Sequence, residues 1–178
     1  MENQRIRISK QMLKNALLNL LEEKDIRKVT VYELCREAQI NRTTFYRYYG
    51  SIYDVIDEIK DEFFRSMEEL MLKEDVSSMQ TLEATLVYAR QNRRLILILM
   101  SVYPQNPVLE ELMQRSSIQD QIRQSCFREL DGWQQEYAAT YAIYGSYEII
   151  AKWLTTENDI SAHQIASLIM EINRRYES

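Results

Sequence analysis

The side chains best suited to chemistry lie in one short polar and aromatic segment, residues 41–50. Arg42, Thr43 and Thr44 would occupy the first turn of a helix that starts there. Arginine can bind guanine through two hydrogen bonds, and threonine offers a hydroxyl and a methyl that can contact thymine. Three further residues could present hydroxyls or positive charge to phosphate: Tyr46, Arg47 and Tyr48. These residue types predict contact with double-stranded DNA.

The two preceding elements are predicted to be helices. Over residues 9–23, apolar residues recur at intervals of three and four, which is typical of an amphipathic helix. Thr30 is followed three residues later by Glu33, the pattern of a capping box. This pattern predicts a second helix over residues 31–38.

The DNA-contacting segment itself is predicted to form a third short helix. Asn41 can cap its start, and Gly50 is well placed to end it. Phe45 and Tyr49, four residues apart, can turn inward as packing. A helix, a short helix, a tight turn and another short helix form the order of a three-helix head with a helix-turn-helix.

The distribution of charge agrees with a DNA-binding head. The net charge is −5, but residues 1–50 hold 10 Lys/Arg against 6 Asp/Glu, while residues 51–178 hold 12 against 21. A basic head on an acidic body predicts that a polyanion binds at one end only.

The rest of the chain is expected to be helical as well, because it has only 3 Gly and 2 Pro in 178 residues. Helices are predicted over five ranges and then from the Ser161 cap onward: 51–71, 81–91, 93–102, 107–130 and 134–156. The sequence thus predicts an all-α fold, in which a larger helical bundle follows the head.

Several other chemistries are excluded by the sequence. The three glycines allow no phosphate-binding glycine loop. His163 has no neighbours at metal-ligand spacing, and Cys35 and Cys126 lie far apart, so we expect no metal site and two reduced thiols. The longest apolar run, residues 95–100, is far shorter than the roughly 20 residues of a membrane span. With its polar start, the chain is expected in the cytoplasm, away from membranes.

Residues 30–54 resemble the head of TetR-type (tetracycline-repressor-like) bacterial regulators. The family pattern runs T-V-x-x-[IL]-[AC], a turn, [TS]-[FLI]-Y-x-[HY]-[FY] and then S-K-x-[DE]-L. Residues 30–54 carry these motifs, and the likeness as a whole covers about 45 residues of the head. Two positions depart from this pattern. Ile52 replaces the usual lysine, so a phosphate contact is lost unless Arg27, Lys28 or Arg47 supplies it. Gln39 stands in the turn, where a left-handed backbone would favour Gly, Asn or Asp.

The resemblance implies a domain division and a mode of DNA binding. Residues 1–50 would be the DNA-binding domain, and residues 51–178 the dimerisation and effector- or partner-binding domain. In a homodimer, two third helices would enter successive major grooves of a near-palindromic operator, with Arg42, Thr43 and Thr44 at the bases. Thr30 and Tyr32 would contact the DNA backbone.

The resemblance also implies an effector site and a dimer interface in the body. For a small apolar effector the expected pocket residues are Tyr88, Met100, Tyr103, Phe127, Trp133, Tyr137 and Tyr141. Plain core packing is the alternative reading of each of these side chains. For the dimer interface the expected residues are Ile149, Trp153, Ile165, Leu168, Ile169 and Ile172.

The predicted function is a sequence-specific DNA-binding transcriptional regulator, a dimeric repressor that a small molecule releases. The alternative within the same fold is an activator or adaptor that a regulatory protein controls. An enzyme on a helical scaffold is the rival from another class. No nucleophile–base pair and no cofactor loop occurs in the sequence, so we expect no catalytic residues and no cofactor.

Overall fold

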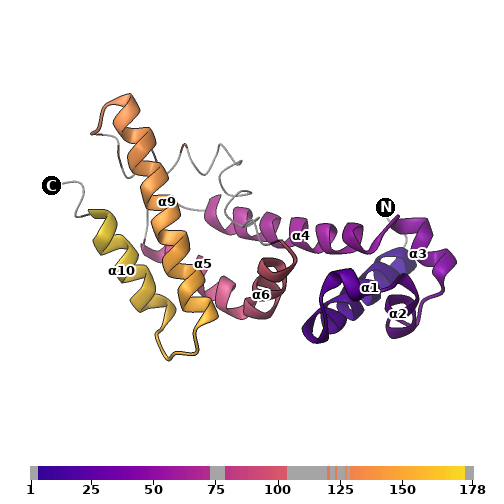
Figure 1. Cartoon of the computed structure of the whole chain (residues 1–178). Helices are drawn as coiled ribbons and strands as arrows, with labels where there is room; N and C mark the ends of the chain where they lie inside the picture. Colours follow the sequence, from indigo (N-terminus) through magenta and orange to yellow (C-terminus); the bar gives the residue numbers. More distant parts are fainter. Residues whose placement is uncertain are drawn as a thin grey trace. The chain divides into compact units, whose positions relative to one another are not determined.

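The computed structural model describes residues 4–72, 79–103, 120, 123, 127 and 129–174. Within these residues all regular structure is helical, which confirms the predicted fold class (Figure 1). The helices are α1 (Gln4–Glu23), a 3-10 turn (Ile26–Lys28), α2 (Val31–Glu37), α3 (Arg42–Tyr48), α4 (Ile52–Leu72), α5 (Met79–Gln91), α6 (Arg93–Val102), α9 (Gly132–Thr155) and α10 (Ala162–Arg174).

The chain forms two compact units. The first contains Met1–Phe64 and Ile98–Pro104, and the second contains Arg65–Leu97 and Gln105–Ser178. Helices α4 and α6 each contribute to both units. The predicted domain division after residue 50 falls between α3 and α4, whereas the first unit also takes in the start of α4; that division stays a prediction.

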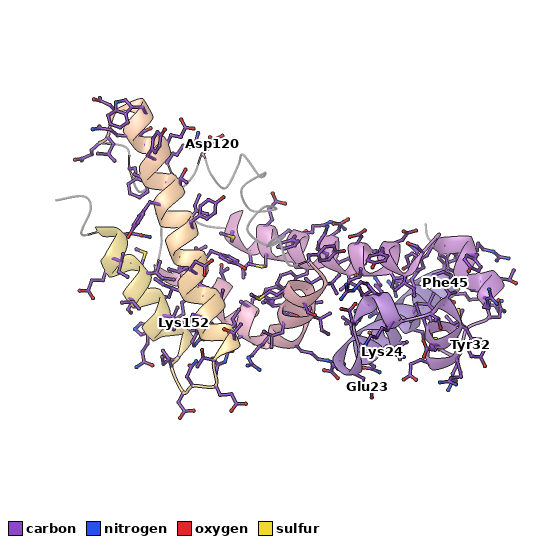
Figure 2. The ribbon with its side chains drawn as sticks, in the orientation of Figure 1. Glu23, Lys24, Tyr32, Phe45, Asp120 and Lys152 are labelled. Atoms are coloured by element: carbon purple, nitrogen blue, oxygen red, sulfur yellow. The ribbon has the colours of Figure 1, made fainter. Side chains whose placement is uncertain are left out.

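In the first unit the apolar sides of α1, α2, α3 and α4 pack together into one core. Helix α2 packs against both α1 and α3. Six side chains from these four helices are completely buried: Leu13, Leu17, Leu34, Phe45, Val55 and Ile56. Figure 2 shows Phe45 directed into this unit and Tyr32 directed away from it.

In the second unit α10 lies beside α5 and α9 (Figure 1). The turn between α9 and α10 is held by Arg90, whose guanidinium lies 4.8 Å from the centre of the Trp153 ring and donates a hydrogen bond of 3.1 Å to the Asn158 carbonyl. The indole of Trp153 donates to the Ile160 carbonyl at 2.8 Å. Arg93 donates to the Leu154 carbonyl near the end of α9. These contacts connect α5 and α6 to the turn that sets the position of α10.

Some helix boundaries differ from those predicted. Helix α9 begins at Gly132, two residues earlier than expected, and the Asp131 N–H donates to the Gln134 side chain at 3.1 Å. The Asn92 side chain lies between α5 and α6, where its amide donates to the Tyr88 carbonyl and closes the end of α5. Most of the helix predicted over residues 107–130, together with Cys126, lies outside the described residues.

Candidate DNA interface

The start of α2 is fixed by the capping box predicted at Thr30 and Glu33. The Glu33 N–H donates to the Thr30 hydroxyl at 3.2 Å, and the Thr30 N–H donates to the Glu33 carboxylate at 3.0 Å. Lys24 binds the same carboxylate at 2.8 Å. Hydrogen bonds from Lys24 and Thr30 lower the pKa of Glu33 to about 2. The box holds exposed Thr30 and Tyr32 at the N-terminal end of α2, where they were predicted to contact the DNA backbone.

Gln39, in the turn from α2 to α3, has a left-handed backbone, which is unusual for a residue other than glycine. Its φ is +54°, the only positive φ among the non-glycine residues described. The Ile40 N–H donates to the Cys35 carbonyl at 2.9 Å, and the Gln39 N–H donates to the Arg36 carbonyl at 3.2 Å. This pair of bonds is a Schellman motif, which requires the left-handed conformation at the first residue beyond the helix cap.

Helix α3 is anchored at both ends. Asn41 caps its start, because the Asn41 side chain accepts a hydrogen bond of 2.7 Å from the Thr44 N–H. Phe45 is fully buried, and Tyr49, which ends the helix, is 4% exposed. The inward packing predicted for Phe45 and Tyr49 is therefore confirmed.

The opposite side of α3 faces solvent. The exposed residues are Arg42, Thr43, Tyr46 and Arg47, whereas Thr44 and Tyr48 are half-buried. Within the described parts of the chain no ion pair involves Arg42 or Arg47. Two guanidinium groups are thus available for an external anion or for base edges.

The arginines that precede α3 in the sequence differ in how much of their positive charge is available to DNA. Arg27 pairs with Asp25 at 2.7 Å, so much of its charge is neutralised locally. Arg36 lies 5.9 Å from the ring centre of exposed Tyr32 and extends the positive surface onto α2. Neither Arg36 nor exposed Tyr53, at the start of α4, was predicted from the sequence as a site residue. Their sequence positions could have indicated them, because Arg36 lies in the last turn of α2 and Tyr53 in the first turn of α4, the two helices that flank α3.

The start of α4 is closed by its own carboxylate. Asp54 accepts hydrogen bonds of 2.7 Å from the Gly50 N–H and from the Ser51 hydroxyl. The Ser51 hydroxyl and the Gly50 amide lower the pKa of Asp54. Ile52, in the place of the family's lysine, is 8% exposed. This helix end therefore presents a carboxylate, and no lysine, to any nearby phosphate.

The predicted effector residues have different surroundings. Trp133, Tyr137 and Tyr141 are 67%, 72% and 55% exposed on α9. Phe127 is buried with Ala139 and Ala142 in a small apolar cluster. The other three are half-buried: Tyr88, Met100 and Tyr103. The Tyr103 hydroxyl donates a hydrogen bond to Asp57 within the first unit. The pKa of Tyr103 is raised, mainly because the hydroxyl is partly buried and also because it binds this carboxylate.

The predicted dimer residues divide into two groups. Trp153, Ile165 and Ile169 are at most 5% exposed, because the helices of their own chain cover them. Leu168 is 45% exposed, and Ile149 and Ile172 are half-buried. Only the second group leaves appreciable surface for a second copy.

Two further observations concern other classes of site. None of the helices described has the length and apolar character that crossing a membrane requires. Among the described residues no group of His, Cys, Asp and Glu is arranged to hold a metal ion. His163 is exposed in the first turn of α10 and lies 3.0 Å from Glu83.

Comparison with known proteins points to one family for the whole chain. Residues 14–59 match the family model for bacterial regulatory proteins of the tetR family, and residues 77–175 match the model for a transcriptional regulator C-terminal region. An uncharacterised HTH-type transcriptional regulator of Bacillus subtilis, YxbF, is 25% identical over 171 residues. The match covers 90% of this chain but only 43% of that relative.

Two crystal structures share the fold. A TetR transcriptional regulator from Streptococcus agalactiae is 18% identical with a TM-score of 0.65, and the match covers 96% of both chains. A protein assigned to the TetR family from Syntrophomonas wolfei is 15% identical with a TM-score of 0.59, and the match covers 94% of both chains.

Proposed function

We propose that this chain, which belongs to the TetR family of bacterial transcriptional regulators, reads its operator with α3 as a homodimer and represses transcription until a small molecule releases it. Membership of the family makes the chain a DNA-binding regulator and not an enzyme. Such a role would place it in the cytoplasm with the DNA.

The observation that carries the proposal is the exposed face of α3. Phe45 and Tyr49 fix the helix from behind, while Arg42 and Thr43 are exposed in its first turn, the part of a recognition helix that reaches base edges. We assign base contacts to Arg42, Thr43 and Thr44. Backbone contacts are assigned to the surrounding residues: Thr30, Tyr32, Tyr46, Arg47 and Tyr48.

A second copy of the chain is proposed to bind the aromatic face of α9. Trp133, Tyr137, Tyr141 and Tyr144 are spaced by four, four and three residues, so they share one side of the helix, and all are at least 46% exposed. Aromatic side chains that lie together at a surface are typical of protein–protein interfaces. This face differs from the set first expected, since part of that set is buried within the chain.

Gly145 gives further support to this interface. A side chain at Gly145 would meet no atom of the chain within 4 Å. A glycine inside a helix costs about 1 kcal/mol relative to alanine. No contact of the described residues requires this glycine, but a helix of a second copy could approach closely there. Exposed Leu168 of α10 would extend the same interface.

The dimer is tested by changing its most exposed aromatic residue. Tyr137→Glu is expected to shift the protein from dimer to monomer in sedimentation equilibrium and to weaken operator binding with it. Val87→Glu, at another exposed apolar residue on α5, is the matched control and is expected to leave the dimer intact. A monomeric wild type, or a dimer that Tyr137→Glu leaves unchanged, would refute this interface.

Two kinds of signal could release the protein from DNA. A small apolar molecule in the body is the first candidate, but three of the seven predicted pocket residues are exposed on α9. That exposure favours, as the second candidate, an activator or adaptor that a regulatory protein controls through a surface. The two are distinguished by whether a small molecule or a purified protein changes operator affinity.

The function as a whole is tested by titrating the protein with DNA from its own upstream region at several salt concentrations. We expect a selective complex whose affinity falls steeply with salt, because Lys and Arg contacts to phosphate release counterions. Equal, weak binding to every duplex would contradict operator recognition.

A further inference from the structure

Behind the recognition helix lies a partly buried group of charged residues that has no place in the DNA contacts assigned above. It contains Lys10 and Lys14 of α1 together with Glu58 and Glu62 of α4. Lys14 is only 6% exposed, although lysine is rarely buried so completely unless it is paired. Its ammonium lies 2.6 Å from one oxygen of Glu62 and 2.7 Å from the other.

Glu58 of α4 binds both lysines of α1. One carboxylate oxygen accepts from Lys10 at 3.0 Å, and the other accepts from Lys14 at 3.3 Å. Burial alone would raise the pKa of Glu58, but the hydrogen bond from Lys10 and the charge of Lys14 lower it. Glu58 is therefore ionised at neutral pH and shared by the two lysines.

Tyr49 is the point at which the group meets α3. It ends that helix: the Tyr49 N–H donates to the Phe45 carbonyl at 3.0 Å. The Lys10 ammonium lies 5.5 Å from the Tyr49 ring centre, and the ring lies 5.8 Å from that of Phe45. The tyrosine is thus held by the core on one side and by the charged group on the other.

We propose that Glu58 is a positioning residue for the recognition helix: by binding Lys10 and Lys14, it holds the Lys10 ammonium beside the Tyr49 ring at the end of α3, and so fixes the orientation of α3 and sets operator affinity without touching DNA. The inference rests on the proposed DNA-binding function. A bound helix must present its first turn to the base edges within a fraction of an ångström. Loss of the Glu58 contacts would leave α3 folded but would widen its range of orientations.

The decisive variant is Glu58→Gln, which keeps the shape of the side chain and removes its charge. The amide has one acceptor oxygen, so it can replace only one of the two oxygens that now bind lysine. Lys14 keeps its pair with Glu62, and we expect the head to remain folded.

The matched control is Asp61→Asn, an exposed residue of the same helix for which no ion pair is described. Both Glu58→Gln and Asp61→Asn remove one negative charge. Through the general electrostatic attraction for DNA, each would leave binding unchanged or strengthen it slightly. If Glu58 positions α3, Glu58→Gln should instead weaken binding to the operator, and Asp61→Asn should not.

The measurement is operator affinity by fluorescence anisotropy, on the selected site and on an unrelated duplex, at a temperature well below the unfolding transition of each variant. For Glu58→Gln we expect at least a tenfold loss on the operator, no loss on the unrelated duplex and an unchanged salt slope.

Three outcomes would count against the proposal in different ways. Failure of the wild type to select an operator would refute the proposed function itself. A selective wild type with Glu58→Gln at full operator affinity, whatever its Tm, would show that the group only stabilises the fold and would overturn the inference. A lower salt slope in Glu58→Gln would also overturn it, because the slope reports phosphate contacts that Glu58 does not make.

Discussion

The left-handed residue at the centre of the helix-turn-helix makes a quantitative prediction about stability. Gln39 has φ +54°, and the two hydrogen bonds of the Schellman motif hold it there. A residue with a Cβ atom pays about 1–2 kcal/mol to adopt this conformation, whereas glycine, which has no Cβ, does not. Glycine in turn loses about 0.5–1 kcal/mol in backbone entropy on folding. Gln39→Gly should therefore stabilise the head by about 0.5–1 kcal/mol.

The assay is urea and thermal unfolding followed by far-ultraviolet circular dichroism. For a unit the size of the head, a gain of this size raises the Tm by about 2–8 °C. Glu37→Gly, two residues earlier and the last residue of α2, is the matched control: its backbone is right-handed, so glycine should destabilise there by up to about 1 kcal/mol. If Gln39→Gly lowers the Tm as Glu37→Gly does, the backbone of the turn is not left-handed and the reasoning fails.

Three further predictions concern the caps, the acid limb and the turn between α9 and α10. Thr30→Ala removes the hydroxyl that caps α2 and should cost about 1 kcal/mol in urea unfolding, whereas an unchanged midpoint would contradict the capping box. Because the pKa of Glu33 is lowered to about 2, its carboxylate stabilises the fold fully above its unfolded pKa near 4.5. This stabilisation is lost as the pH falls toward 2, so Glu33→Gln should flatten stability over that interval in an acid titration, and an equally steep limb would argue against the pairing. Arg90→Met removes the hydrogen bond to Asn158 and the charge above the Trp153 ring, so it should lower stability by about 1–3 kcal/mol and alter tryptophan fluorescence; no change in either would show that the contact is not maintained in solution.

The head could be predicted closely because its signals are local. Thr30 with Glu33 and Asn41 with Thr44 each join residues three apart, and such contacts depend little on the rest of the fold. The left-handed backbone at Gln39 was indicated instead by the resemblance to the family, whose members often have Gly, Asn or Asp in this turn.

The body was harder to predict because α9 is apolar on nearly all sides. Periodicity identifies a buried face only where the opposite face is polar, so it could not tell which side of α9 the chain itself covers. Trp153 therefore seemed available to a partner but is buried beneath Arg90, while Tyr137 seemed suited to a pocket but is exposed. The burial of Lys14 depends on Glu58 and Glu62, 44 and 48 residues away, and no local pattern indicates such a contact.

The central claim, that α3 reads bases, is tested most directly with Arg42→Ala on a set of operators that differ at one base pair each. The wild type should discriminate at the contacted position by about 1–3 kcal/mol, and Arg42→Ala should lose that discrimination there and nowhere else. Arg36→Ala, an exposed arginine of α2, should instead weaken binding to every sequence alike. If Arg42→Ala also weakened all sequences equally, Arg42 would be a phosphate contact and the assignment of base recognition to this residue would be contradicted.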